Sequence, residues 1–240
     1  MTLRIGLLGR GRLGSLVEAA ADSTNDAVVV WTAGRGPIPS DAVDVAIDVS
    51  TAAAVPEHIE WAISTGTNLV LGVTGWSEDQ TALTSLRQQG DQASIGVLIA
   101  PNFSLSIALM HRLSAVLGRY AARLGSSADL AISETHHRAK VDAPSGTAVA
   151  LRSAVAAAAQ RNDSDIQTTS LRVGAVVGQH QVRLETDLET IELRHEAHSR
   201  SVFADGALQA ARWAQGKKGV FNLDDWADAE LAHLFAPATY

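Results

Sequence analysis

The sequence predicts an α/β protein: a parallel sheet covered by helices on both faces, followed by a second, α+β domain with a mixed, mainly antiparallel sheet. Three observations predict this class. In the N-terminal part, short apolar runs alternate with longer helical patterns, which is typical of βαβ units. A glycine-rich turn directly follows the first apolar run. After Pro101 the pattern changes to shorter strands with turn residues between them.

Five strands are expected before Pro101, at residues 3–8, 27–32, 43–50, 68–72 and 94–100, because these runs are rich in Val, Ile and Leu. Residues 12–22, 52–65 and 77–90 are long enough to form helices between them. The segment 34–41 is a short loop of Gly and Pro, so one connection is unusually short.

After Pro101, Ser104 can cap a helix whose apolar positions recur at helical spacing and which ends at Gly125. An alanine-rich helix is expected over 145–159 and a last helix over 203–215. Strands are expected at 130–133, 168–177, 181–185 and 189–196. A tight hairpin turn is expected at Gly178-Gln179.

Composition argues against several classes of protein. The 240 residues are 46% hydrophobic and 19% charged, the balance of a globular rather than a disordered chain. A net charge of −7 argues against a general nucleic-acid binder, because neutralising phosphates requires a basic face. No run reaches the ~18 apolar residues of a membrane span, and arginines interrupt the N-terminal run, unlike a signal peptide. Without cysteine, disulfides and thiolate metal sites are excluded, and we expect a cytoplasmic protein.

The glycine-rich turn Gly9-Arg10-Gly11-Arg12-Leu13-Gly14 matches the dinucleotide pattern GxGxxG between a strand and a helix. The first glycine permits a tight turn, the second lets the backbone approach a pyrophosphate, and the third allows close packing of helix on strand. Arg12 can add a phosphate contact. The pattern alone fits equally a turn that only connects the two elements, but the βα units around it favour a Rossmann-like nucleotide site.

The residues after the second strand bear on the choice of dinucleotide. An acid there would hold the ribose of NAD, but the chain reads Trp31-Thr32-Ala33-Gly34-Arg35. Arg35 is therefore a candidate partner for the 2′-phosphate of NADP. The alternative is that Arg35 is an ordinary solvated loop residue.

Residues 134–148 concentrate groups that suit an acid–base reaction on an anion. His136, His137 and Lys140 precede a small-residue turn at a helix start, where Ser145, Gly146 and Thr147 offer backbone N–H groups to a carboxylate. A histidine beside them has the right pKa range for proton delivery. Zinc is less expected, because adjacent histidines seldom point at one metal ion. The alternative is a polar helix cap beside two surface histidines.

This segment resembles the signature of the dihydrodipicolinate reductase (4-hydroxy-tetrahydrodipicolinate reductase) family of bacterial lysine and diaminopimelate synthesis. It matches the pattern E-x-H-H-x-x-K-x-D-A-P-S-G-T-A throughout. The resemblance continues at residues 72–75, 100–104, 170–172, 178–180 and 198–207, so it covers nearly the whole chain.

The resemblance implies an enzyme that transfers hydride from NADH or NADPH to a cyclic, unsaturated dicarboxylic imine and yields tetrahydrodipicolinate. It implies His136 as general acid and Lys140 as the residue that protonates or polarises the reacting system. The other positions that it implies are His137, Ser145, Gly146, Thr147 and Thr74 for substrate, and Gly72, Ala100, Phe103 and Arg200 for cofactor, beside Gly9, Gly11, Arg12, Leu13, Gly14 and Arg35.

The resemblance also implies an architecture. Residues 1–104 and 200–240 are expected to form a discontinuous dinucleotide-binding domain. Residues 105–199 are expected to form an inserted domain that binds substrate and assembles a homotetramer.

The chain departs from the family pattern at four places. The glycine turn is one residue shorter, Val73 and Ser50 each replace a threonine, and the segment between Arg35 and Val43 is much shorter. These changes bear on the cofactor side, so the choice between NADPH and NADH stays open. Two other functions also stay open: another NAD(P)-dependent oxidoreductase of an amino or imino dicarboxylate, and a non-catalytic nucleotide-binding sensor. The presence of both His136 and Lys140 argues against the sensor, which needs no acid.

Overall fold

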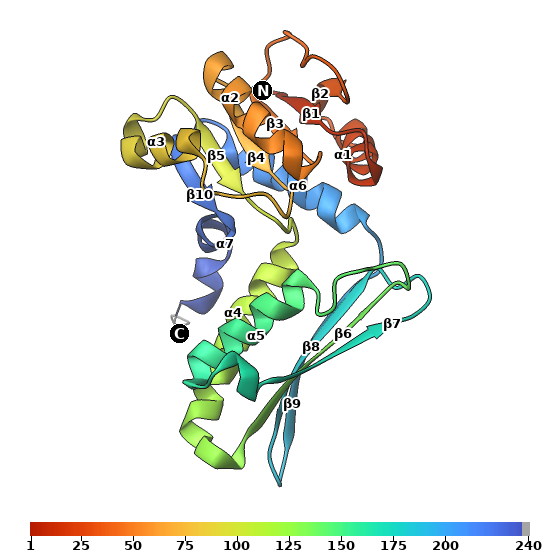
Figure 1. Ribbon diagram of the computed structural model, residues 1–240, viewed down its shortest axis with the longest axis vertical. Helices are drawn as coiled ribbons and strands as arrows, with labels where there is room; N and C mark the ends of the chain where they lie inside the picture. Colours follow the sequence, from red (N-terminus) through yellow and green to blue (C-terminus); the bar gives the residue numbers. More distant parts are fainter. Residues whose placement is uncertain (237–240) are drawn as a thin grey trace. The chain divides into compact units, whose positions relative to one another are not determined.

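The protein, described here by a computed structural model over residues 1–236, consists of two compact units (Figure 1). The first unit combines residues 1–104 with the chain from Arg200 onward, and the second unit is residues 105–199. No helix among the described residues is both long and apolar enough to cross a membrane.

The first unit is built on a six-stranded parallel sheet in the order β10-β5-β4-β3-β1-β2. Its strands are β1 (Leu3–Leu8), β2 (Ala27–Ala33), β3 (Val45–Asp48), β4 (Asn68–Leu71), β5 (Gly96–Ile99) and β10 (Gly219–Asn222). Every residue of β3, β4 and β5 is buried, as expected for strands covered on both faces. The predicted parallel α/β class is therefore confirmed, although the sixth strand was not predicted.

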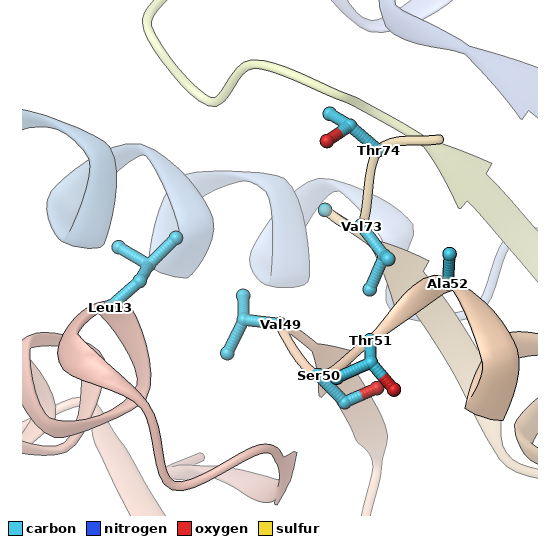
Figure 2. Close-up of a pocket in the computed structure, with 8 residues that line it drawn as sticks. Leu13, Val49, Ser50, Thr51, Ala52, Val73 and Thr74 are labelled. Atoms are coloured by element: carbon cyan, nitrogen blue, oxygen red, sulfur yellow. The ribbon is translucent and has the colours of Figure 1, made fainter. Parts of the chain in front are cut away.

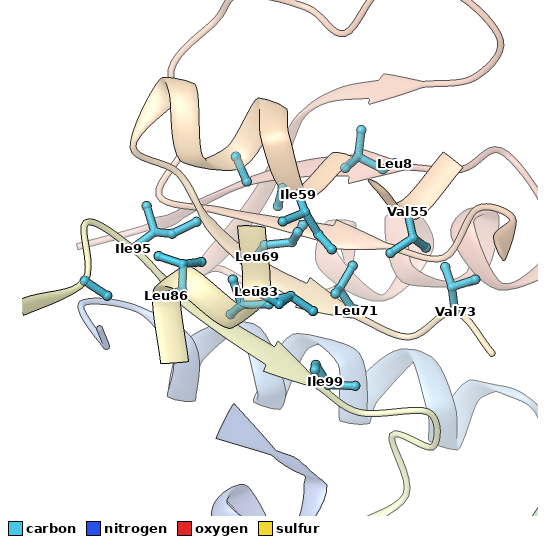
Figure 3. Close-up of a cluster of buried hydrophobic side chains, with 14 of the residues drawn as sticks. Leu8, Val55, Ile59, Leu69, Leu71, Val73, Leu83, Leu86, Ile95 and Ile99 are labelled. Atoms are coloured by element: carbon cyan, nitrogen blue, oxygen red, sulfur yellow. The ribbon is translucent and has the colours of Figure 1, made fainter. Parts of the chain in front are cut away.

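The helices of this unit cover the sheet in pairs, α1 packing against α6 and α2 against α3. Their bounds are α1 (Arg12–Asp22), α2 (Val55–Thr65), α3 (Thr81–Gln89), α6 (Ser201–Ala214) and α7 (Leu223–Leu231), with short 3₁₀ turns η1 (Ala52–Ala54), η2 (Gly90–Gln92) and η5 (Ala232–Phe235). Figure 3 shows Val55 and Ile59 of α2 and Leu83 and Leu86 of α3 in one buried cluster with strand residues such as Leu71. This core fixes the strand ends that carry the loops described below.

The strand order places a topological switch between β1 and β3, because the chain leaves β1 for β2 on one side and continues to β3 on the other. In open α/β sheets, ligands bind in the crevice outside the carboxyl ends of strands at such a point. The loops that meet there are residues 9–11 and 49–51.

The second unit is a four-stranded sheet in the order β7-β6-β8-β9, in which only the β6–β7 pair is parallel. Its elements are α4 (Leu105–Leu124), η3 (Gly125–Ser127), β6 (Asp129–His136), α5 (Gly146–Ala159), η4 (Asp163–Asp165), β7 (Gln167–Arg172), β8 (Gly178–Glu185) and β9 (Thr190–Ala197). The helices α4 and α5 pack against each other and cover one face of the sheet. The predicted mixed, mainly antiparallel sheet is confirmed.

The predicted hairpin turn at Gly178-Gln179 is wrong. Both residues belong to β8, and β7 is not a neighbour of β8. The hairpin joins β8 to β9 instead, where the Thr186 N–H donates to the Glu189 carbonyl at 3.0 Å. The reason is that α5 returns the chain beside β6 in the parallel direction, which places β7 on the outer side of β6.

Close packing of α4 on α5 depends on Gly118. A Cβ at this position would lie 2.6 Å from the Val155 carbonyl oxygen and 2.9 Å from the Ala158 Cβ. Gly→Ala in an exposed helix interior ordinarily stabilises by up to about 1 kcal/mol. We expect Gly118→Ala instead to lower the free energy of unfolding by about 1–3 kcal/mol, because the helices must move apart.

Urea unfolding of the variant would measure this change in stability. Arg119→Ala, an exposed neighbour on α4, is the matched control and should change stability by less than about 0.5 kcal/mol. A more stable Gly118→Ala protein would contradict the packing argument.

Candidate functional site

The glycine turn at the end of β1 has the geometry of a phosphate cradle. Gly9 has φ +117°, and a Cβ there would lie 2.8 Å from the Val49 backbone. A Cβ at Gly14 would lie 2.1 Å from the Gly9 carbonyl oxygen, so helix and turn pack closely. At Gly11, the N-cap of α1, a Cβ would meet nothing within 4 Å, and no side chain caps the helix. The first N–H groups of α1 therefore suit a pyrophosphate.

A cavity of about 240 Å³ lies beside this turn (Figure 2). Its lining comes from the start of α1, the loop after β3 and the loop after β4: Leu13, Val49, Ser50, Thr51, Ala52, Gly72, Val73 and Thr74. The structure thus brings the predicted residues Leu13, Gly72 and Thr74 together. The sequence analysis did not assign residues 49–52 to the site, although their place after a buried parallel strand was a usable signal.

A buried carboxylate holds the loop after β3. Asp48 is fully buried, and its Oδ1 accepts a hydrogen bond of 2.9 Å from the Ser50 N–H. Its Oδ2 lies 2.6 Å from Nδ1 of His58 on α2. These contacts orient the hydroxyl-bearing residues Ser50 and Thr51 at the cavity.

Three further residues that were predicted to bind the cofactor lie in the first unit. Ala100 and Phe103 are buried, and the Phe103 ring occupies the space that a Cβ of Gly72 would need. Gly72 is therefore required for this packing. Arg200 is the N-cap residue of α6 and is half-buried.

Arg10 and Arg35 lie near the carboxyl end of β2, and both are exposed, as is Arg12 at the start of α1. The Arg10 Nε and Nη2 donate to the Thr32 carbonyl at 3.1 and 2.6 Å. This contact brings the Arg10 guanidinium to the strand end where Arg35 was predicted to act. Sequence reasoning did not assign Arg10, because as a variable position of GxGxxG it carries no signal of its own.

In the second unit, Glu134 and His136 form a buried pair on β6. The Glu134 Oε2 contacts His136 Nδ1, and its Oε1 accepts a 2.7 Å bond from the Arg172 guanidinium of β7. Burial raises the pKa of Glu134, but hydrogen bonds from Arg172 and Ser170 and the nearby His136 outweigh it and lower that pKa to about 2. Burial lowers the pKa of His136, while Glu134 partly opposes this. Glu134 is therefore a fixed anion that orients the His136 ring.

Ser145 and His180 extend this network. Both are buried, and Ser145 Oγ lies 3.2 Å from His180 Nε2 on β8. Ser145 is the N-cap of α5, where its N–H donates to Glu134 Oε1 and its Oγ accepts from the Ala148 N–H, both at 3.2 Å. Sequence reasoning missed Glu134, Arg172 and His180 as site residues. Their only signal was membership of the family-like segments.

Lys140 lies in the loop between β6 and α5, near the same helix start. Its Nζ contacts both carboxylate oxygens of Asp142, at 2.7 and 2.8 Å. The Lys140 ammonium, and to a smaller extent the Gly146 N–H, hold the pKa of Asp142 below its ordinary value. An anion is thus already bound by two of the groups predicted to hold a substrate carboxylate. His137 is half-exposed at the start of this loop, and Thr147 is half-exposed in the first turn of α5.

Glu134, His136 and His180 offer ligand atoms within 4.8 Å of one another, which is a spacing that a metal ion could use. The surroundings do not suit a divalent cation, because Arg172 already binds the Glu134 carboxylate and Lys140 adds a further positive charge. The network instead suits an anionic ligand and a proton donor.

The buried histidines predict acid sensitivity. Burial lowers the pKa of His180 to about 4, with His136 and His195 adding in the same direction. Between pH 6.5 and 4 the unfolded state therefore binds a proton that the folded state does not, so stability falls as pH falls. We expect His180 to account for a loss of about 3 kcal/mol over this range.

Urea unfolding at pH 7 and pH 4 would measure this loss. His180→Gln should reduce it, whereas His233→Gln, an exposed histidine, should leave it unchanged. An equal loss in wild type and His180→Gln would contradict the assignment.

Comparison with known proteins finds one family over most of the chain. The family descriptions "Dihydrodipicolinate reductase, N-terminus" and "Dihydrodipicolinate reductase, C-terminus" match residues 37–103 and 106–226. The chain is 37% identical to the 4-hydroxy-tetrahydrodipicolinate reductase of Magnetococcus marinus, over 91% of this chain and 80% of that protein. It is 36% identical to the protein of the same name from Zymomonas mobilis, over 93% and 96%.

Among solved structures, a dihydrodipicolinate reductase from Paenisporosarcina sp. TG-14 with dipicolinate bound is similar in fold. Its TM-score is 0.77 at 20% sequence identity, and the match covers 92% of this chain and 98% of that chain.

Proposed function

Because this chain belongs to the dihydrodipicolinate reductase family, we propose that it reduces 4-hydroxy-tetrahydrodipicolinate to tetrahydrodipicolinate with NADPH or NADH, in diaminopimelate and lysine biosynthesis. One observation of the structure supports this function most. Lys140 and the N-terminus of α5 bind the carboxylate of Asp142. This site is close in sequence to His136, whose ring is oriented by the buried carboxylate of Glu134. A dicarboxylate substrate and a proton donor need such a combination.

The residues divide between cofactor and substrate. The first unit binds the dinucleotide through Gly9, Gly11, Arg12, Leu13 and Gly14, with the cavity beside the turn as its continuation. The second unit binds the substrate, with one carboxylate on Lys140 and on the N–H groups of Ser145, Gly146 and Thr147, and with His137 as a further contact. The family resemblance also assigns Thr74, a residue of the first unit, to the substrate. Gly72, Ala100, Phe103 and Arg200 shape the nicotinamide end.

The reduced nicotinamide supplies the hydride. The chain then supplies the proton that completes the reduction, from His136 or from Lys140. Burial lowers the pKa of His136 and so favours its neutral form in the free enzyme. A bound dianion raises the pKa of a nearby imidazole, so substrate binding itself favours the protonated donor. Glu134 keeps Nδ1 engaged, and the missing side chain of Gly178 leaves room at Nε2.

The direct test is oxidation of NADPH and NADH in the presence of enzymatically generated substrate, with a control that lacks substrate. We expect substrate-dependent oxidation and competitive inhibition by pyridine-2,6-dicarboxylate. A protein that binds cofactor and pyridine-2,6-dicarboxylate but oxidises nothing would be a sensor. A protein that reduces other imino dicarboxylates but not this one would belong to the alternative oxidoreductase class.

For the cofactor, NADPH should be used at least as well as NADH. The chain has no acid between Trp31 and Arg35, and we expect Arg35 and Arg10 to contact a 2′-phosphate at the end of β2. We expect Arg35→Ala and Arg10→Ala each to raise the KM for NADPH about fivefold to tenfold, because an exposed arginine–phosphate contact contributes on the order of 1 kcal/mol.

The KM values for both cofactors should be compared at low and high salt, since salt screens an exposed contact. Arg87→Ala, an exposed arginine of α3 paired with Glu78, is the control. A clear preference for NADH in wild type, or an NADPH preference unchanged in both variants, would show that these arginines do not read the phosphate.

We also propose a cytoplasmic homotetramer assembled through the second unit. The helices α4 and α5 cover one face of its sheet, and the other face carries half-exposed or exposed side chains such as Ala131, Thr135 and Leu171. Light scattering coupled to size exclusion would give the oligomeric state.

A further inference from the structure

We propose that His180 is a positioning residue of the substrate site: it donates a hydrogen bond to Ser145 and so commits the Ser145 hydroxyl to donate to a carboxylate of the substrate. This inference rests on the proposed function and deepens it. His180 lies on β8, far in sequence from the histidine–lysine segment, and the proposed function gives it no part in binding or catalysis.

The geometry gives Ser145 Oγ two neighbours. The Ala148 N–H donates to it as the helix cap, at 3.2 Å, and His180 Nε2 lies at 3.2 Å. The residue is 2% exposed, so the direction of its own hydrogen depends on these neighbours. The first is necessarily a donor. The second is a donor or an acceptor according to the tautomer of His180.

Burial determines the charge and the tautomer of His180. The residue is 5% exposed, and its pKa of about 4 keeps the ring neutral at physiological pH. Its Nδ1 is buried and has no hydrogen-bond partner among the described residues. An orphaned buried N–H group is rarer in proteins than an under-satisfied acceptor. The proton therefore resides on Nε2, and Nδ1 carries the unpaired lone pair.

The donor on Nε2 has a direct consequence for Ser145. Its oxygen accepts from both Ala148 and His180, so its O–H hydrogen is left to donate to a third group. At the start of α5 that group is an anion, because the Gly146 N–H and Lys140 already hold a carboxylate there. The Ser145 hydroxyl can therefore only donate to a ligand. This favours binding of an ionised carboxylate over binding of a group that must itself donate a hydrogen bond.

His180 does not act as a proton relay to His136. The two rings contact edge to face, with centroids 5.1 Å apart and planes at 72°. Nδ1 of His136 contacts Glu134, and Nδ1 of His180 has no hydrogen-bond partner among the described residues. Loss of His180 should therefore weaken binding of the substrate and leave the chemical step intact.

The test compares His180→Leu and His180→Asn, which lose the donor at this distance, with His180→Gln, whose amide N–H can replace it. We expect both loss variants to raise the KM for substrate and the Kd for pyridine-2,6-dicarboxylate about tenfold, with kcat within about twofold, since one hydrogen bond to a charged ligand is at stake. His180→Gln should remain within about threefold of wild type in both constants. His195→Asn, the cross-strand neighbour on β9, is the matched control and should change neither constant.

A double-mutant cycle makes the test specific. Ser145→Ala should raise the same constants, and adding His180→Asn to it should raise them no further, because the two residues act as one unit. Thermal unfolding of each variant separates a folding defect from a binding defect. If His180→Leu does not fold, His180→Asn and the cycle carry the test.

The proposal is overturned by a fall in kcat with an unchanged KM, which indicates a relay, or by additive effects of Ser145→Ala and His180→Asn. Failure of the proposed function looks different. The wild-type protein would then oxidise no reduced cofactor with this substrate and bind no pyridine-2,6-dicarboxylate, whatever residue stands at position 180.

Discussion

Lys140→Ala is expected to lower kcat/KM about a thousandfold while the fold stays intact. Charge-assisted contacts to an anion contribute about 1.5–3 kcal/mol, and proton delivery contributes about a hundredfold or more. Lys140 has no place in either hydrophobic core, and its side chain is 23% exposed. The loss should therefore appear in steady-state kinetics with both cofactors but not in thermal unfolding.

Two further variants separate the contribution of Lys140 to substrate binding from its contribution to proton delivery. Lys140→Arg keeps the charge but is a far weaker acid, so it should recover binding of pyridine-2,6-dicarboxylate more than it recovers kcat. Asp142→Asn removes the anion that Lys140 binds in the structure, so it should lower the KM for substrate. A Lys140→Ala enzyme with wild-type kcat/KM would remove Lys140 from the mechanism.

His136→Ala is expected to lower kcat/KM about a hundredfold, less than Lys140→Ala, because one proton donor is lost without a charge contact to the substrate. The pH profile gives the more specific readout. Burial lowers the pKa of His136, so kcat/KM of the wild type should rise as pH falls and should still be rising below the ordinary pKa of a histidine.

This acid limb should be absent in His136→Ala. Glu134→Gln should move it to lower pH, because the carboxylate raises the pKa of His136 and its removal lowers that pKa further. A pH profile that is the same in wild type and both variants would contradict the role of His136 as general acid.

The parallel sheet could be predicted because most of its strands are short, mainly apolar and separated by helices, so each of them is recognisable by itself. The strand β10 could not be predicted, because it has only four residues, Gly219–Asn222. Phe221 is half-exposed and Asn222 is exposed, so the segment lacks the pattern of a buried strand. The pairing of strands in the second unit could not be predicted from the local sequence either. Whether β7 pairs with β6 or β8 depends on how α5 returns the chain, which no turn residue encodes.

The site was predictable only where it is contiguous in sequence. His136, Lys140 and Ser145 lie within ten residues of one another, and their chemistry is visible there. Glu134, Arg172 and His180 come from three strands and meet because of register: Glu134 lies opposite His180 across β6–β8, and His136 lies opposite Arg172 across β6–β7. Register depends on the whole sheet, so these partners could not be derived from spacing.

The late return of the chain to the parallel sheet has a consequence for synthesis. The strand β10 covers the flank of β5, and Asn68 on β4 donates to the Ala214 carbonyl of α6 at 2.7 Å while accepting from the Gly96 N–H at 2.9 Å. A nascent chain that ends before Arg200 lacks both elements, so β5 remains an edge strand with unpaired backbone groups, which is a template for aggregation. Ribosome-bound or truncated chains of 1–199 should therefore be the species that need a chaperone, and residues 200–231 should rescue them when added in trans.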